Sequence, residues 1–125
     1  MPHPPNRLKK IRLTRHQTKT FEISVKTNAG RRAKLSGANI ILSVRLGASS
    51  PVIIRKEVGS GIQITDPVYG KAVVTLSSDD TAKLEATTYR YDIWVVYPAV
   101  GSEPPVQEPV VSSDLIVAES VTDFV

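Results

Sequence analysis

Apolar and polar residues alternate along most of the middle of this chain. In residues 20–27 the apolar side chains Phe21, Ile23 and Val25 are separated by polar ones, a pattern typical of a half-buried β-strand. Two further segments alternate in the same way, at residues 38–46 and 62–65, and residues 71–76 are also predicted to form a strand. Because successive strand side chains point to opposite faces, we expect each segment to bury one face and expose the other.

The most strand-like stretch is residues 87–97, where almost every residue is β-branched or aromatic. One set of alternate positions holds Tyr89, Tyr91, Ile93, Val95 and Tyr97. The other set holds Arg90, Asp92, Trp94 and Val96. This second set carries both charges, so it predicts the wetter face. Trp94 is therefore a candidate for contact with a partner, and the alternative is burial against a second sheet.

Glycine, proline and short polar residues divide the strands. They predict turns at residues 28–30, 47–50 and 66–70. Ser77 to Asp80 are typical helix N-cap residues, so we expect one helical turn at residues 81–84. Further strands are predicted at residues 52–57 and around 115–117, and a short edge strand around Ile11 and Leu13. The proline-rich residues 98–109 are predicted to form an exposed loop.

Seven or eight short strands with almost no helix predict an all-β domain, either a sandwich or a barrel. The one-sided alternation favours a sandwich of two antiparallel sheets. A chain of 125 residues fits one domain. We therefore expect a basic, proline-rich N-terminal arm at residues 1–19, followed by a β-sandwich domain at residues 20–125 that includes the loop at 98–109.

Charge is unevenly distributed. Residues 1–34 hold ten Lys or Arg against one acid, Glu22, whereas residues 103–125 hold five acids and no base. Either the two solvated termini differ in sign by chance, or they meet within one fold or between neighbouring copies in a head-to-tail assembly. On the second reading, the predicted assembly contacts are Arg7, Lys9, Lys10, Arg12, Arg15, Trp94, Glu103 and Glu108.

The sequence contains little that indicates chemistry. It has no cysteine, and its two histidines, His3 and His16, lie in the proline-rich and basic part of the chain. We predict no catalytic, cofactor-binding or metal-binding residues. No apolar run approaches the length of a membrane span, and no signal-peptide core is present. The basic arm could neutralise phosphates, but it lacks a reading helix and interleaved aromatic residues, so we do not expect nucleic acid as the partner.

Four motifs, taken together, resemble a known family. They are Leu35-Ser36-Gly37-Ala38, Gly61-Ile62-Gln63-Ile64, Asp80-Thr81-Ala82-Lys83-Leu84 and Tyr89-Arg90-Tyr91-Asp92-Ile93. Their order resembles the small immunoglobulin-like domains of tailed-bacteriophage structural proteins, in particular the N-terminal domain of the baseplate upper protein family. The resemblance covers about residues 20–97. The chain departs from the family pattern at Thr87 and Thr88, where a glycine is usual, and in its proline-rich insertion after Pro98.

The resemblance implies an immunoglobulin-like antiparallel β-sandwich and a virion structural or adaptor role without catalysis. It transfers no functional residues. We expect assembly contacts in a phage tail, baseplate, fibre or neck, with other virion proteins and copies of the chain itself as partners, in a virion assembled in the host cytoplasm. No small-molecule substrate or membrane is expected. The alternatives are a carbohydrate-binding or host-receptor-binding module using Trp94 and residues 99–109, a capsid decoration protein with a basic arm, and an arm-mediated nucleic-acid binder.

Overall fold

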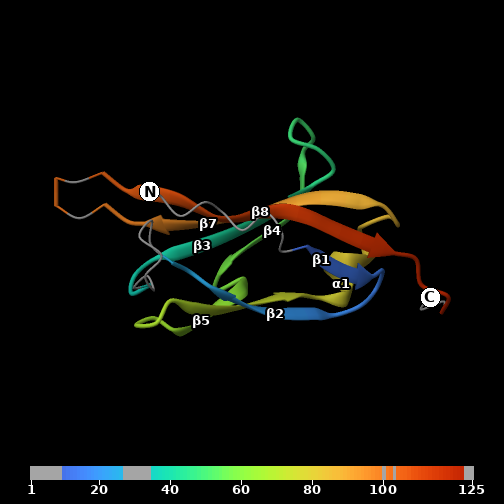
Figure 1. Cartoon of the computed structure of the whole chain (residues 1–125), viewed down its shortest axis with the longest axis horizontal. Coiled ribbons are helices and arrows are strands. Elements are labelled where there is room, and N and C mark those ends of the chain that lie inside the picture. The colour runs from blue at the N-terminus through green and yellow to red at the C-terminus, as the bar shows by residue number, and fades with distance from the viewer. Residues whose placement is uncertain (1–9, 27–34, 100, 103, 123–125) are drawn as a thin grey trace.

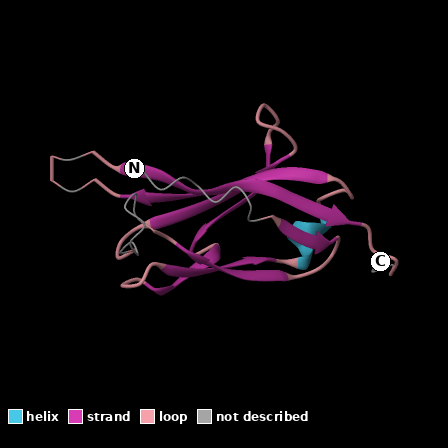
Figure 2. Cartoon of the chain, in the orientation of Figure 1, coloured by secondary structure: helices cyan, strands magenta, loops and turns pink. Residues whose placement is uncertain are grey.

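A computed structural model describes residues 10–26, 35–99, 101, 102 and 104–122 of the protein. Eight strands and one short helix make up this part of the chain, which confirms the all-β prediction (Figure 2). In chain order the elements are β1 (Ile11–Thr14), β2 (Lys19–Ser24), β3 (Asn39–Arg45), β4 (Val52–Val58), β5 (Gly61–Asp66), β6 (Lys71–Leu76), α1 (Ser78–Ala82), β7 (Thr88–Tyr97) and β8 (Val106–Ala118).

The strands form one mixed sheet with the order β1-β8-β7-β3-β4-β5-β6-β2. Most neighbouring strands are antiparallel, but β1 pairs with β8 and β4 pairs with β5 in parallel. The prediction of wholly antiparallel sheets is therefore wrong, and an immunoglobulin-like sandwich is not confirmed. The continuous sheet folds over into two layers, so that its shape approaches a barrel.

Figure 1 shows the two layers, with β8, β7 and β3 in one and β2 and β5 in the other. The chain passes between them at the β4–β5 connection, where the ladder contains just two pairs, Glu57 with Gly61 and Val58 with Ile62. The Ser60 amide donates to the Glu57 carbonyl at 2.8 Å, which closes a tight loop. Gly59 and Gly61 have φ angles of 88° and 96°, a region that favours glycine. One compact loop thus carries the chain into the second layer without reversing its direction.

The core lies between the layers and is built from the alternate positions that the sequence predicts. β3, β6 and β7 each bury every second residue along most of their length. The side chains that are almost completely buried include Leu35, Ile40, Leu42, Leu76, Leu84, Ile93 and Leu115. Leu46 was expected to continue the inward set of β3, but it lies beyond the end of the strand and is 54% exposed.

The loop predicted at residues 98–109 is shorter than expected. β8 begins at Val106 and pairs with β7 from there on, so β7 and β8 form a long hairpin that projects from the body in Figure 1. Pro109 lies in this strand opposite Trp94, beside a shift in the β7–β8 register. Proline is tolerated at bulges and on edge strands because no ladder hydrogen bond requires its missing N–H.

The predicted arm also needs correction, because part of it belongs to the folded domain. The edge strand expected around Ile11 and Leu13 is β1, and both side chains are buried in the core. β1 lies beside the end of β8, pairing Ile11 with Leu115 and Thr14 with Ala118. An arm that ends at residue 19 is thus too long, and residues 1–9 lie outside the described part of the chain.

Candidate interaction surfaces

Trp94 lies on the outer face of the layer formed by β3, β7 and β8. Its side chain is 37% exposed, so burial against a second sheet does not occur. In the ladders Trp94 lies opposite Ile41 of β3 on one side and Pro109 of β8 on the other. We call these three residues the Trp94 face. An exposed indole between two apolar neighbours offers a flat surface and one N–H donor to a partner.

Polar and charged residues continue this outer face along β7. Arg90 is hydrogen-bonded and ion-paired to Asp114 of β8, and these side chains are 49% and 31% exposed. Arg45 lies opposite Arg90 in the β3–β7 ladder, but its guanidinium donates to the carbonyls of Ala48 and Ser50 at 3.3 Å. These bonds offset the repulsion expected between like charges on paired strands. A shallow polar groove of about 350 Å³ results, lined by Ser43, Arg45, Ala48, Arg90, Tyr91, Asp92 and Ser112.

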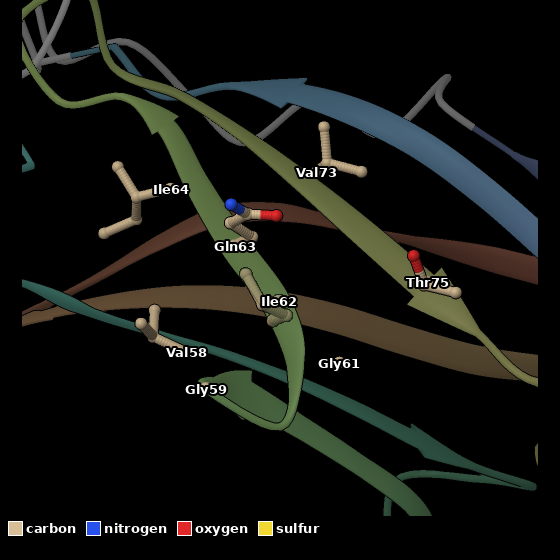
Figure 3. Close-up of a pocket in the computed structure, with 8 residues that line it drawn as sticks. All are labelled: Val58, Gly59, Gly61, Ile62, Gln63, Ile64, Val73 and Thr75. Carbon is tan, nitrogen blue, oxygen red and sulfur yellow. The ribbon is translucent and has the colours of Figure 1, made fainter.

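A larger groove of about 610 Å³ lies along β5 and the neighbouring β6. Figure 3 shows its lining: Val58, Gly59, Gly61, Ile62, Gln63, Ile64, Val73 and Thr75. Backbone, apolar groups, a carboxamide and a hydroxyl line the groove, and none of these eight residues has a charged side chain. Such a lining suits packing against an uncharged segment and provides no acid or base for catalysis.

A third cluster ties α1 to the sheet. The Lys56 ammonium of β4 lies 2.8 Å from the Asp80 carboxylate of α1, with side-chain exposures of 18% and 10%. Asp80 completes a capping box with Ser77: its carboxylate accepts from the Ser77 amide at 2.8 Å, and its own amide donates to the Ser77 hydroxyl at 3.1 Å. A Cβ at Gly61 would come within 2.5 Å of Lys56 Cδ. Glycine at this position therefore gives the lysine room to reach Asp80.

The surroundings of Asp80 change its pKa in opposing directions. Burial raises the pKa, because a carboxylate loses solvation inside the protein. Hydrogen bonds from Lys56 and Ser77, together with the lysine charge, outweigh burial and leave the pKa below its usual value. The cluster is therefore held as a charged pair at neutral pH, and its contacts connect elements of the fold.

The predicted contact residues do not meet in one site. Lys10 and Arg12 are exposed at β1, whereas Arg15 donates from Nη2 to the Ala82 carbonyl at 3.2 Å and lies 3.7 Å from Glu119. Arg15 therefore joins the β1–β2 turn to the end of α1. Glu108 is partly buried near Tyr97, whose pKa is raised by burial and by the negative charge of Glu108. Arg7, Lys9 and Glu103 lie outside the described residues.

Lys56 was missed as a structural residue by the sequence analysis, as was the Arg90–Asp114 pair. Both pairs join residues 24 positions apart in the chain, so no local spacing indicates them. Among the described residues, no three His, Asp or Glu side chains are grouped in a way that could hold a metal ion. In the same part of the chain, no helix is long and apolar enough to span a membrane.

Comparison with known proteins identifies a fold relative but no sequence relative. No family model matches the chain, and neither does any curated protein. Among solved structures, the N-terminal domain of ORF48 from phage TP901-1 matches with a TM-score of 0.57 and 11% sequence identity. The match covers 92% of this chain and 89% of that domain. At this identity the likeness concerns the fold, and by its fold this chain is similar to a domain of a phage protein.

Proposed function

We propose that the chain is a non-enzymatic structural or adaptor protein of a tailed-phage virion, with assembly contacts in the tail, baseplate, fibre or neck. The observation that carries this proposal is the likeness to the ORF48 domain over nearly the whole of both chains. The motifs that resemble the baseplate upper protein family support it independently, because they come from sequence alone. The protein would be located in the virion, which is assembled in the host cytoplasm. Its partners would be other virion proteins and copies of itself.

The Trp94 face is the best candidate contact on the described surface. Aromatic side chains are enriched where interfaces form, because they bury a large area at a small cost in conformational entropy. Ile41 and Pro109 flank the indole, and the Arg90–Asp114 pair lies farther along the same face. An apolar centre with a polar periphery is the common arrangement of a specific interface. Lys10, Arg12 and Glu108, with Arg7, Lys9 and Glu103, remain proposed contacts.

Incorporation into particles tests this function. In the phage that encodes the chain, we expect the wild-type protein to co-purify with assembled particles in a fixed ratio to other virion proteins. Trp94→Ala should reduce that ratio at least several-fold while the purified variant keeps the wild-type Tm. Val68→Ala is the matched control, since Val68 is a 59% exposed apolar residue on the β5–β6 turn. Absence of the wild-type protein from particles refutes the structural role.

A carbohydrate-binding or receptor-binding module is the second candidate. The observation that favours it is the position of Trp94 on the same strand and face as Asp92, which lines the polar groove with Ser43 and Ser112. Aromatic stacking beside hydroxyl and carboxylate groups suits a sugar ring. A glycan array probed with the purified protein should then give a signal that Trp94→Ala abolishes. If the array gives no signal and the protein is incorporated into particles, the sugar-binding role is excluded and the assembly role remains.

A further inference from the structure

The turn between β3 and β4 exposes a cluster of apolar side chains. Leu46, Val52 and Ile53 are 54%, 40% and 36% exposed, and they are three of the eight large apolar residues that are exposed in the described part of the chain. Residues 46–53, which we call the apolar tip, contain no charged side chain. Exposed apolar residues that occur singly are ordinary, whereas a cluster of them marks a surface that contacts another molecule.

Hydrogen bonds hold the apolar tip in one shape. The Ser50 amide donates to the Gly47 carbonyl at 3.0 Å. The Arg45 guanidinium, at the end of β3, donates to the carbonyls of Ala48 and Ser50 at 3.3 Å. A loop that is already ordered loses little conformational entropy when it binds. The tip is therefore suited to enter a preformed groove.

The groove along β5 and β6, which we call the β5 groove, has the matching character. None of the eight residues that line it is charged, and its volume of about 610 Å³ lies within the range of about 300–1,000 Å³ that is usual for binding clefts. A charged segment would lose hydration there without meeting an opposite charge. The basic residues 1–19 and the acidic residues 103–125 are therefore poor occupants, and an uncharged apolar segment is the better one.

The apolar tip cannot reach the groove of its own chain. β4 runs from Val52 in the tip to Val58 in the groove, a span of about 20 Å. β5 pairs in parallel with the end of β4 and continues in the same direction, which carries the groove farther from the tip. In Figure 1 the turn between β3 and β4 projects at the top of the view, and β5 lies at the bottom. Tip and groove can therefore meet only between two molecules.

We propose that the apolar tip of one copy inserts into the β5 groove of a neighbouring copy. Apolar surface removed from water supplies the contact. Because tip and groove lie on opposite sides of the molecule, the contact links copies head to tail, and it closes into a ring when the rotation between copies allows. This inference rests on the proposed structural role and names a contact between copies that does not involve Trp94.

Disulfide trapping tests the contact directly, because the chain has no cysteine of its own. A tagged Ser49→Cys protein is mixed with a Gln63→Cys or a Thr75→Cys protein at high concentration under mild oxidation. We expect linked heterodimers with at least one of the two groove variants. The matched control is Gln107→Cys, which replaces an exposed glutamine of β8 outside the groove. High salt should leave the yield unchanged or raise it, because the contact does not depend on exposed charges.

Substitutions in the tip and in the groove give the specific check. Leu46→Ser with Val52→Thr should lower the heterodimer yield several-fold while the Tm stays near that of the wild type, since both side chains are exposed. Gln63→Glu in the Thr75→Cys partner should also lower the yield, because it places a charge in the groove, whereas Gln107→Glu should not. Equal trapping by Gln107→Cys, no trapping at either groove position, or a several-fold fall in high salt overturns the proposal.

A chain that carries both Ser49→Cys and Gln63→Cys tests the arrangement of the copies. Head-to-tail contacts should link it into a ladder of dimers, trimers and larger multimers. Internal linkage as a monomer, independent of dilution, would mean that the tip reaches its own groove and would refute a second copy as the occupant. Linked dimers without larger species would overturn the head-to-tail arrangement.

The trapping result and the proposed function fail separately. If the protein is absent from particles, the structural role is wrong whatever the trapping shows. If the chain with both cysteines enters particles but forms no linked multimers there, the structural role stands and the contact between tip and groove is wrong. Non-reducing electrophoresis of purified particles distinguishes these cases.

Discussion

The ion pair between Lys56 and Asp80 gives the sharpest prediction about stability. The two groups are 2.8 Å apart with side-chain exposures of 18% and 10%, and they join β4 to α1. Lys56→Met keeps much of the aliphatic stem but removes the cation, which leaves the Asp80 carboxylate in a poorly solvated site. Removing one partner of a buried pair costs about 3–5 kcal/mol. Because the Ser77 amide still donates to Asp80 and the pair is not fully buried, we expect a loss at or below the lower limit of that range, about 2–3 kcal/mol.

Urea unfolding at neutral pH measures this loss, and for a domain of this size it corresponds to a fall in Tm of roughly 8–12 °C. The double variant Lys56→Met/Asp80→Asn removes both charges, while the new amide oxygen can still accept from Ser77. We expect the double variant to be more stable than Lys56→Met alone. With Asp80→Asn as the fourth protein of the cycle, the coupling energy should be at least about 1 kcal/mol. Arg55→Met is the matched control. Arg55 also forms a 2.8 Å pair, with Glu57, but the exposures are 55% and 39%, so its effect should be small.

The same pair predicts a pH dependence. The pKa of Asp80 is lowered in the folded protein from its usual 3.8. A lowered carboxyl pKa contributes stability that is present above the unfolded-state value and is lost as pH falls through the folded-state value. The difference in stability between wild type and Lys56→Met should therefore be largest near neutral pH and shrink below about pH 4. An unchanged difference at pH 3, or a loss below about 0.5 kcal/mol at pH 7, refutes the reasoning.

Three further predictions concern single residues. Ser77→Ala removes the N-cap of α1 and should cost about 1 kcal/mol in urea unfolding, whereas Ser77→Thr should retain most of the stability. Gly61→Ala should lower the free energy of unfolding more than Gly37→Ala does. Both glycines have positive φ, but a Cβ at Gly61 would contact Lys56, whereas one at Gly37 would have no atom within 4 Å. Equal losses of stability in the two variants would contradict the role of the Lys56 contact. Burial raises the pKa of Tyr91 to about 12 from 10.0, so its contribution to stability is present below pH 10 and is lost as pH rises towards 12. Absorbance titration at 295 nm should show this late ionisation in wild type, and its amplitude should fall in Tyr91→Phe, in which Tyr97 is the remaining tyrosine with a raised pKa.

The resemblance found in the sequence and the fold likeness are separate lines of argument. The motifs predict a phage structural domain, and the structure matches a domain of a phage protein at 11% identity. Residues can diverge this far while the fold persists, because a core needs apolar side chains of suitable volume at alternate positions more than it needs particular residues. The finer prediction, an immunoglobulin-like sandwich, depended on strand pairing that the motifs do not specify.

Local pattern determined which residues form strands and which face each strand buries. β2, β3 and β5 were predicted from alternation, and β7 from its β-branched and aromatic residues. The position of Trp94 on an outer face was predicted as well, because side-chain direction in a strand follows position with a period of two. The capped turn around Ser77 was also local, since an N-cap bonds to amides two or three residues away. These features involve neighbours in the chain, so the sequence is sufficient to indicate them.

Tertiary structure decided how the strands pair. The parallel β1–β8 contact joins residues about 100 positions apart. Where the chain passes between the layers, two bridges pair the end of β4 with the start of β5. No local periodicity distinguishes these pairings from others that bury the same faces. The sequence predicts Pro109 to lie in a loop. In the structure it lies in β8, where the register shift beside Trp94 means that no ladder hydrogen bond requires its N–H. The role of Lys56 was also decided by the fold, which places Asp80 beside it. The free energy of a charged group depends on neighbours that only the folded structure provides.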